Sequence, residues 1–243
     1  MIANIQIADQ THQVNLNQGV DLCIGFDAAQ GPLAWGVAHM QVKPVTVGDW
    51  VGLVREGASV NFCDVLVNPH GQGTHTECVG HISKEHDSVQ DYLTRNWFPA
   101  LLYTADVVDG VVDLSGLPLP DNDWSYQAVI IRTRPNTPDK RQRVYSGQNP
   151  PHFNPQVLRQ LSDIGVAHFL TDLPSVDPEE DGGALAAHKA FFLDENGDKR
   201  RGRTITELIY APDTLQDGRY ILNLQIAPLT MDAVPSRPVL YLV

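Results

Sequence analysis

The chain has 243 residues and a formal net charge of −12, because 17 lysines and arginines face 29 aspartates and glutamates. Such an acidic balance excludes nucleic acids and anionic membranes as main partners, since both repel negative charge. No apolar run approaches the roughly 18 residues that a membrane-spanning helix requires.

Short apolar runs, taken in chain order, predict more strands than helices. One helix is predicted over 88–97 with Ser88 as its N-cap, and another over 154–164 with Pro155 at the first helical position. No segment repeats, so we expect a single domain over residues 1–243. The predicted strands cover 20–24, 65–67, 101–107, 128–133, 168–171 and 239–243.

Two stretches rich in proline, glycine or charge predict exposed loops, over 134–154 and 194–203. In the first, Arg134 either is solvated beside counter-charges or grips a substrate carboxylate, as a guanidinium group can. The first residues lack the basic and apolar segments of a secretory signal. The three cysteines show no Cys-x-x-Cys spacing, so we expect a reducing, cytoplasmic location.

Four of the nine histidines lie close together in sequence, at His70, His75, His81 and His86. His75 and Glu77, two residues apart, would project from one face of an extended segment. Imidazole and carboxylate groups are the usual ligands of zinc and manganese, so this spacing permits chelation. The alternative is a surface turn held by hydrogen bonds.

A metal site needs more ligands than this segment supplies, and the C-terminal half offers two candidates. His188 ends a small-residue stretch, 181–188, with a helical pattern. Glu207 lies in the apolar run 204–210, where a carboxylate is costly to bury unless it is paired or bound to metal. Alternatively, Glu207 faces solvent from a helix. Asp172 and Asp177 follow a predicted strand, and we expect them to shape the turn after it.

Residues 71–81 read Gly-Gln-Gly-Thr-His-Thr-Glu-Cys-Val-Gly-His, and the segments 171–177, 205–208 and 235–241 follow in order. Together these four stretches resemble the cyclase family of metal-dependent hydrolases, which includes kynurenine formamidase and isatin hydrolase. The family's signature is His-x-Gly-Thr-His-x-Asp-x-Pro-x-His. The resemblance spans most of the chain. It implies a mixed, β-rich α/β domain of the swivelling β/β/α-like type, assembled as a homodimer or homotetramer.

The chain departs from that signature at three positions. Gly71 replaces the first histidine, Glu77 the aspartate and Val79 the proline. His70 is displaced by one residue, which on an extended chain would turn it to the opposite face. A kink at Gly71 or Gly73 would return His70 to the site, and the extra methylene of Glu77 would accommodate a shifted metal.

The resemblance implies a divalent metal, zinc or manganese, bound by His75, Glu77, His188, Glu207 and His70. It also implies hydrolysis of a small linear N-formyl amide or a cyclic amide by a metal-activated water, with His81 as the acid–base residue. Because the first histidine is missing, the alternative is a descendant that binds a small molecule or partner without catalysis. A third possibility keeps the metal but performs dehydration or lactone opening.

Three residues are candidates for substrate contact. Trp35 and Phe62 would stack on an aromatic substrate, although core packing is the competing role for both. Gln72 offers an amide near the predicted ligands, and its oxygen is a weaker metal donor than imidazole.

Overall fold

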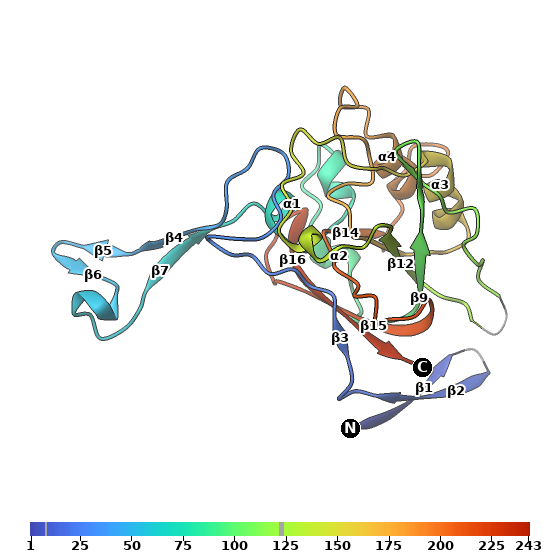
Figure 1. The fold of residues 1–243 in the computed structure, drawn as a ribbon, viewed down its shortest axis with the longest axis horizontal. Coiled ribbons are helices and arrows are strands. Elements are labelled where there is room, and N and C mark those ends of the chain that lie inside the picture. The colour runs from blue at the N-terminus through green and yellow to red at the C-terminus, as the bar shows by residue number, and fades with distance from the viewer. Residues whose placement is uncertain (8, 122–123) are drawn as a thin grey trace.

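The computed structural model describes residues 1–7, 9–121 and 124–243. Its core is an eight-stranded sheet with the strand order β15-β9-β12-β13-β14-β8-β16-β3. Because β15 also pairs with β16, seven of these strands close into a ring to which β3 is added (Figure 1). The strands are β3 (Val20–Asp21), β8 (His75–Glu77), β9 (Trp97–Ala105), β12 (Ala128–Thr133), β13 (His168–Thr171), β14 (Thr204–Glu207), β15 (Gly218–Ile226) and β16 (Ala233–Leu242).

Strands β9, β12, β13 and β14 run parallel to one another, and β12 and β13 are buried along their whole length. Parallel strands covered on both faces read as continuous apolar runs, and this pattern predicted the bounds of β12 and β13 correctly. Strand β8 lies between β14 and β16 and is antiparallel to both. Three segments far apart in sequence therefore meet at β8.

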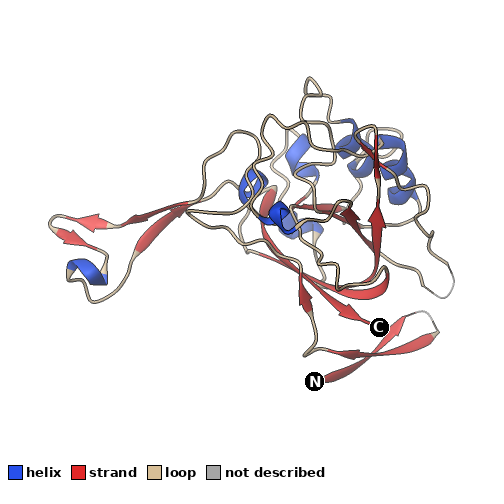
Figure 2. Cartoon of the chain, viewed as in Figure 1, coloured by secondary structure: helices blue, strands red, loops and turns tan. Residues whose placement is uncertain are grey.

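Helix α3 (Pro155–Asp163) begins as predicted, because the side chain of Asn154 accepts a hydrogen bond from the backbone N–H of Gln156. Helix α4 (Ala186–Phe192) packs against it, and the two lie together beside the sheet (Figure 2). In the part of the chain that the structure describes, no helix has the length and apolar character needed to cross a membrane. The other helices are α1 (Pro69–Gln72), α2 (Val89–Tyr92) and the 3-10 helices η1 (Val54–Glu56), η2 (Val79–Ile82) and η3 (Pro138–Arg141).

The helix predicted over 88–97 is correct at its start and wrong at its end. The Ser88 side chain caps α2, but the helix stops at Tyr92 and β9 begins at Trp97. The register of β9 with β15 explains the difference, because Trp97 pairs with Asn223 and Phe98 with Leu222. Strand pairing and burial of Phe98 prevail here over helical periodicity.

Several short strands pair outside the ring. Residues 41–66, which we call the arm, extend away from the sheet in Figure 1 and include the predicted strand near Val65. The arm contains β4 (Gln41–Pro44), β5 (Thr46–Val47), β6 (Trp50–Val51) and β7 (Cys63–Leu66). The remaining pairs are β1 (Ile2–Ile7) with β2 (Gln10–Asn15), and β10 (Val107–Val108) with β11 (Val111–Val112).

Candidate metal centre

The floor of the site is formed by β8 and its neighbour β14. His75 and Glu77 project from the same face of β8, as the spacing predicts, and His75 lies opposite Glu207 in the β8–β14 register. Nε2 of His75 is 3.4 Å from Oε2 of Glu207. Glu207 ends strand β14 and is buried, so its alternative interpretation as a solvent-facing helix residue is wrong.

His70 and His81 reach Glu77 from two short helical turns that flank β8. His70 lies in the helical turn α1, and Nδ1 of His70 is 3.2 Å from Oε2 of Glu77. Helix η2 carries His81, whose Nε2 lies 4.0 Å from the same oxygen. The one-residue displacement of His70 is thus compensated by a helical turn.

Gly71 permits this turn because the chain passes very close to its neighbours there. A Cβ at Gly71 would lie 2.7 Å from Cγ2 of Val37 and 3.0 Å from the carbonyl oxygen of Ala34. The N–H of Ala34 also donates to the carbonyl of Gly71. A side chain at position 71 would therefore push the 34–37 segment away from α1.

His188 enters from the first turn of α4, so the expected helix over 181–188 is wrong. That helix begins only at Ala186, after Leu185 in a left-handed conformation with φ 47°. Nε2 of His188 lies 2.9 Å from Oε1 of Glu77, and its Nδ1 lies 2.6 Å from Oδ2 of Asp177. Asp177 therefore orients His188, a role more specific than the turn-shaping role that we expected.

One acidic residue of the cluster, Asp232, was not predicted from the sequence. Oδ2 of Asp232 lies 3.2 Å from Nε2 of His70 and 3.6 Å from Nδ1 of His81. Asp232 directly precedes β16, whose Ala233 pairs with Glu77. Only this strand register, which no local pattern reveals, brings Asp232 to the histidines.

The buried polar atoms at the centre fit a divalent cation. Nε2 of His75, Nε2 of His188 and both oxygens of Glu77 are buried and make no hydrogen bond with any described residue. Two donor groups, His70 with Glu77 and His81, and His75 with Glu77 and Glu207, each have ligand atoms within 4.8 Å of one another. Buried polar atoms that make no hydrogen bond are costly, and imidazole with carboxylate is the donor set of zinc and manganese.

Charges within the cluster stabilise one another. Burial lowers the pKa of His70, but Asp232 and Glu77 outweigh it and raise that pKa to about 10. Burial raises the pKa of Glu77, whereas His81 and His188 hold it well below its usual range. Burial lowers the pKa of His188, and Glu77 with Asp177 raises it well above the ordinary value. Protons on these imidazoles compete with a metal, so metal binding must release them.

A cavity of about 330 Å³ opens onto this cluster. Trp35 lines it with 41% of its surface exposed, so it is not packed in the core. The cavity is lined by Trp35, Asn68, His70, His81, Ser175, Asp177, Pro178, Glu179, Asp181, Leu185, His188 and Glu207.

Three other candidates lie outside this cavity. Phe62 is on the arm and 57% exposed. Gln72 is buried, and its amide accepts from the N–H of Asn68 and donates to the carbonyl of Ala38, so it serves the backbone around α1. Arg134 pairs with Asp106 at the rim of a different cavity, away from the histidines.

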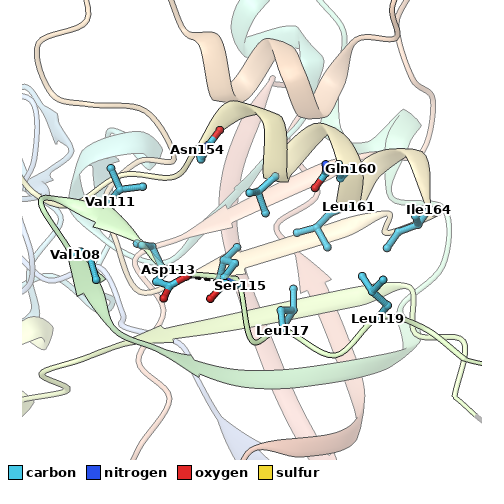
Figure 3. A pocket seen from close by; sticks show the side chains of 13 residues that line it. Val108, Val111, Asp113, Ser115, Leu117, Leu119, Asn154, Gln160, Leu161 and Ile164 are labelled. Atoms are coloured by element: carbon cyan, nitrogen blue, oxygen red, sulfur yellow. Dashed lines mark hydrogen bonds between the residues drawn. The ribbon is translucent and has the colours of Figure 1, made fainter.

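A larger cavity of about 910 Å³ lies between the β10–β11 hairpin and α3 (Figure 3). Its lining is mainly Val, Leu and Ile, and its carboxylate, Asp113, accepts a hydrogen bond from the N–H of Ser115. None of its lining residues is a histidine or cysteine. Of these two cavities, the smaller one is lined by histidines.

Comparison with solved structures shows a shared fold. A structure described as a predicted metal-dependent hydrolase from Bacillus stearothermophilus has 17% identity and a TM-score of 0.61, with 92% of this chain and 98% of that chain covered. Isatin hydrolase A from Labrenzia aggregata, bound to benzyl benzoate, has 15% identity and a TM-score of 0.61, with 93% of each chain covered. Isatin hydrolase A from Ralstonia solanacearum has 12% identity and a TM-score of 0.57, with 93% of this chain and 92% of that chain covered.

No curated protein matches the chain. The family model for Cyclase, in contrast, matches residues 20–178, which is more than half of the sequence and includes the segment from His70 to His81. The histidines and carboxylates of that segment stand at the centre of the cluster described above. The chain belongs to the Cyclase family.

Proposed function

We propose that this protein is a metal-dependent hydrolase of a small linear N-formyl amide or a small cyclic amide. The observation that carries the proposal is the convergence of buried imidazole and carboxylate atoms of His75, Glu77 and His188 beside a cavity of about 330 Å³. The isatin hydrolases with a similar fold support the same class of reaction. The cavity is sized for a small molecule.

The metal would be zinc or manganese, held by His75, Glu77, Glu207, His188 and His70. A divalent cation in this position supplies Lewis acidity, which lowers the pKa of water and polarises an amide carbonyl. Strands β8 and β14 carry three of these donors, and helices α1 and α4 carry the two other histidines. Glu207 is further fixed because its Oε1 accepts a hydrogen bond from the N–H of Val176.

His81 is the acid–base residue in this proposal. Its side chain is 30% exposed and lines the cavity, so it can contact both water and substrate. Nδ1 of His81 faces Asp232, which leaves Nε2 to accept a proton from water and return it to the departing amine nitrogen. Asp232 stabilises the protonated imidazole between these two transfers.

The test combines elemental analysis with turnover of formanilides and cyclic amides. We expect about one metal ion or more per chain, and its loss in His75→Ala and in Glu207→Ala. We expect His81→Ala to keep the metal and lose roughly 100-fold or more in turnover. His86→Ala is the matched control, since His86 is exposed and lies outside the cluster.

Two results would contradict the proposal. Loss of metal in His81→Ala would make His81 a ligand rather than the acid–base residue. Absence of metal after incubation with zinc and manganese would favour the alternative of a non-catalytic binding protein.

We also propose that the chain works as a homodimer or homotetramer. The arm carries many exposed apolar side chains, and a two-stranded ribbon alone is marginally stable in water. A second copy of the chain that covers these side chains would bury the apolar surface and stabilise the ribbon. The residues are Val42, Val47, Trp50, Val54, Val60, Phe62, Val65 and Leu66.

The cytoplasm is the cellular setting that we propose. All three cysteines, Cys23, Cys63 and Cys78, are free thiols. Free thiols persist best in a reducing compartment.

A further inference from the structure

The cavity at the metal centre carries negative charge on its walls as well as at its floor. Four of its lining residues are carboxylates, Asp177, Glu179, Asp181 and Glu207, and none of the lining residues is a lysine or arginine. Glu77 and Asp232 add two more carboxylates next to the histidines. One divalent cation would offset two of these six charges and two cations would offset four. Because metal binding releases the protons on the imidazoles, these histidines add no positive charge to the loaded site, and the cavity would stay negative.

Glu179 and Asp181 are fixed in place although neither belongs to the metal cluster. Glu179 accepts hydrogen bonds from the N–H groups of Gly147 and Asn149, at 2.6 and 2.9 Å. Asp181 accepts from the N–H groups of Gly183 and Leu185, at 2.7 and 2.6 Å. Both carboxylates are thus held on the cavity wall by backbone donors rather than by cationic side chains.

Trp35 is held at the same cavity by the same loop. Ser146 accepts a hydrogen bond from the N–H of Gly36, next to Trp35, at 2.8 Å. The loop 146–149 therefore fixes both the tryptophan segment and Glu179. Trp35 also has a left-handed backbone with φ 58°, which is costly for a bulky residue and tends to be retained where function requires it.

We propose that the substrate of this cavity is an organic cation: an amide that bears an ammonium group. The proposal rests on the hydrolase function above and names its substrate class. An indole face attracts ammonium groups through its quadrupole, and nearby carboxylates add attraction in a partly dry cavity. The ammonium group would lie against Trp35 and Glu179, with the amide directed to the histidines. The same charges would exclude amides that carry a carboxylate or sulfonate.

The test measures binding of three anilines to the metal-loaded protein by titration calorimetry. 4-(Trimethylammonio)aniline is cationic, 4-tert-butylaniline has the same shape without charge, and 4-aminobenzenesulfonate is anionic. We expect the cation to bind about tenfold more tightly than its neutral isostere at low salt, and the anion to bind most weakly. The difference should shrink as salt screens the charges.

Glu179→Gln and Trp35→Leu should each reduce the preference for the cation over the isostere several-fold. Glu180→Gln should preserve it, because Glu180 is the adjacent, exposed glutamate and does not line the cavity. Glu179→Gln removes one of the two carboxylate acceptors that hold the 146–149 loop, so it could disturb that loop as well as the charge. Trp35→Leu changes the cavity without altering those hydrogen bonds. Equal or tighter binding of the neutral or anionic aniline by the wild type would overturn the proposal.

Binding and hydrolysis are decided separately in this design. The anilines contain no amide bond, so their affinities do not depend on turnover. The three matching formanilides, incubated with the same protein, report hydrolysis. If the protein prefers the cation but hydrolyses none of the formanilides, the proposed hydrolase function is contradicted and the charge selectivity is supported. If it hydrolyses formanilides without preferring the cation, the hydrolase function is supported and the charge selectivity is contradicted.

Discussion

Glu77 joins the two donor groups of the site. Its Oε2 faces His70 and His81, while its Oε1 faces His188 from the other side. The family signature has the shorter aspartate at this position. A glutamate carries its carboxylate farther from the strand than an aspartate would. A single buried side chain thus connects α1, η2 and α4.

The residue types of the site were more predictable than their directions. Imidazoles and carboxylates at positions 70, 75, 77, 188 and 207 were all expected near the metal, and the structure brings them together. The orientation of His70 was not predictable, because it depends on α1, a single helical turn. Such a turn is too short to leave a periodic pattern in the sequence.

His168 provides a prediction at the scale of one residue, away from the metal. Burial, together with Arg203 and Arg95, lowers the pKa of His168 to about 3. Its Nδ1 lies 2.8 Å from Oγ1 of Thr204, and it is buried and neutral in the folded protein. The unfolded chain binds a proton here below its ordinary pKa of about 6.5, whereas the folded chain does not.

Stability should therefore fall as the pH drops from about 6.5 towards 3. Between pH 7 and 5, His168 should account for about 2 kcal/mol of lost unfolding free energy. The measurement is urea unfolding of metal-free wild type and His168→Gln at both pH values. An identical pH dependence in the two proteins would show that His168 does not cause the loss.

At the scale of elements, helix α4 owes its start to a residue from another loop. Its own N-cap residue, Leu185, provides no side-chain hydrogen bond. Asp177 instead accepts from the N–H of Ala187 at 2.6 Å and from the N–H of His188 at 3.1 Å. The same carboxylate contacts Nδ1 of His188, so Asp177 both caps the helix and orients the histidine ligand.

Asp177→Asn should therefore lower the affinity for zinc by roughly 10- to 100-fold, as loss of a partner behind a histidine ligand commonly does. A chromophoric chelator in competition with the protein measures this affinity. Glu180→Gln, from the same acidic segment, should retain wild-type affinity. Unchanged zinc binding in Asp177→Asn would mean that His188 is oriented without Asp177.

Elements differ in how well the sequence predicts them. Strands β12 and β13 and helix α3 have long or well-capped patterns, and their predicted bounds were accurate. Glu207 illustrates the difficulty, because four residues of β14 fit either a strand or a helix by pattern. Strand β8 has only three residues, and its place between β14 and β16 is fixed by its partners. Partners distant in sequence leave no local signal.

At the scale of the whole molecule, the arm governs assembly in our proposal. Val65 lies opposite Val42 in the β4–β7 register, and both are exposed, as is Phe62 nearby. Replacing Phe62 and Val65 together with serine should convert an oligomer into a monomer, because the covered apolar area would shrink.

Light scattering after size-exclusion chromatography gives the mass of each species. Leu119→Ser is a suitable control, since Leu119 is an exposed apolar residue outside the arm. Metal content should remain unchanged in all variants if the arm acts only in assembly. A wild-type protein that is monomeric at micromolar concentration would contradict the proposal.

The closure of the ring through β15 and β16 has a consequence for the order of events in folding. Ala233 of β16 faces Glu77 across the ladder, although most of the chain separates them in sequence. Long-range pairings of this kind form late, because a large loop must close first. A short peptide containing only His70 to His81 would therefore bind metal weakly. Uptake of the metal would mark the end of folding rather than its beginning.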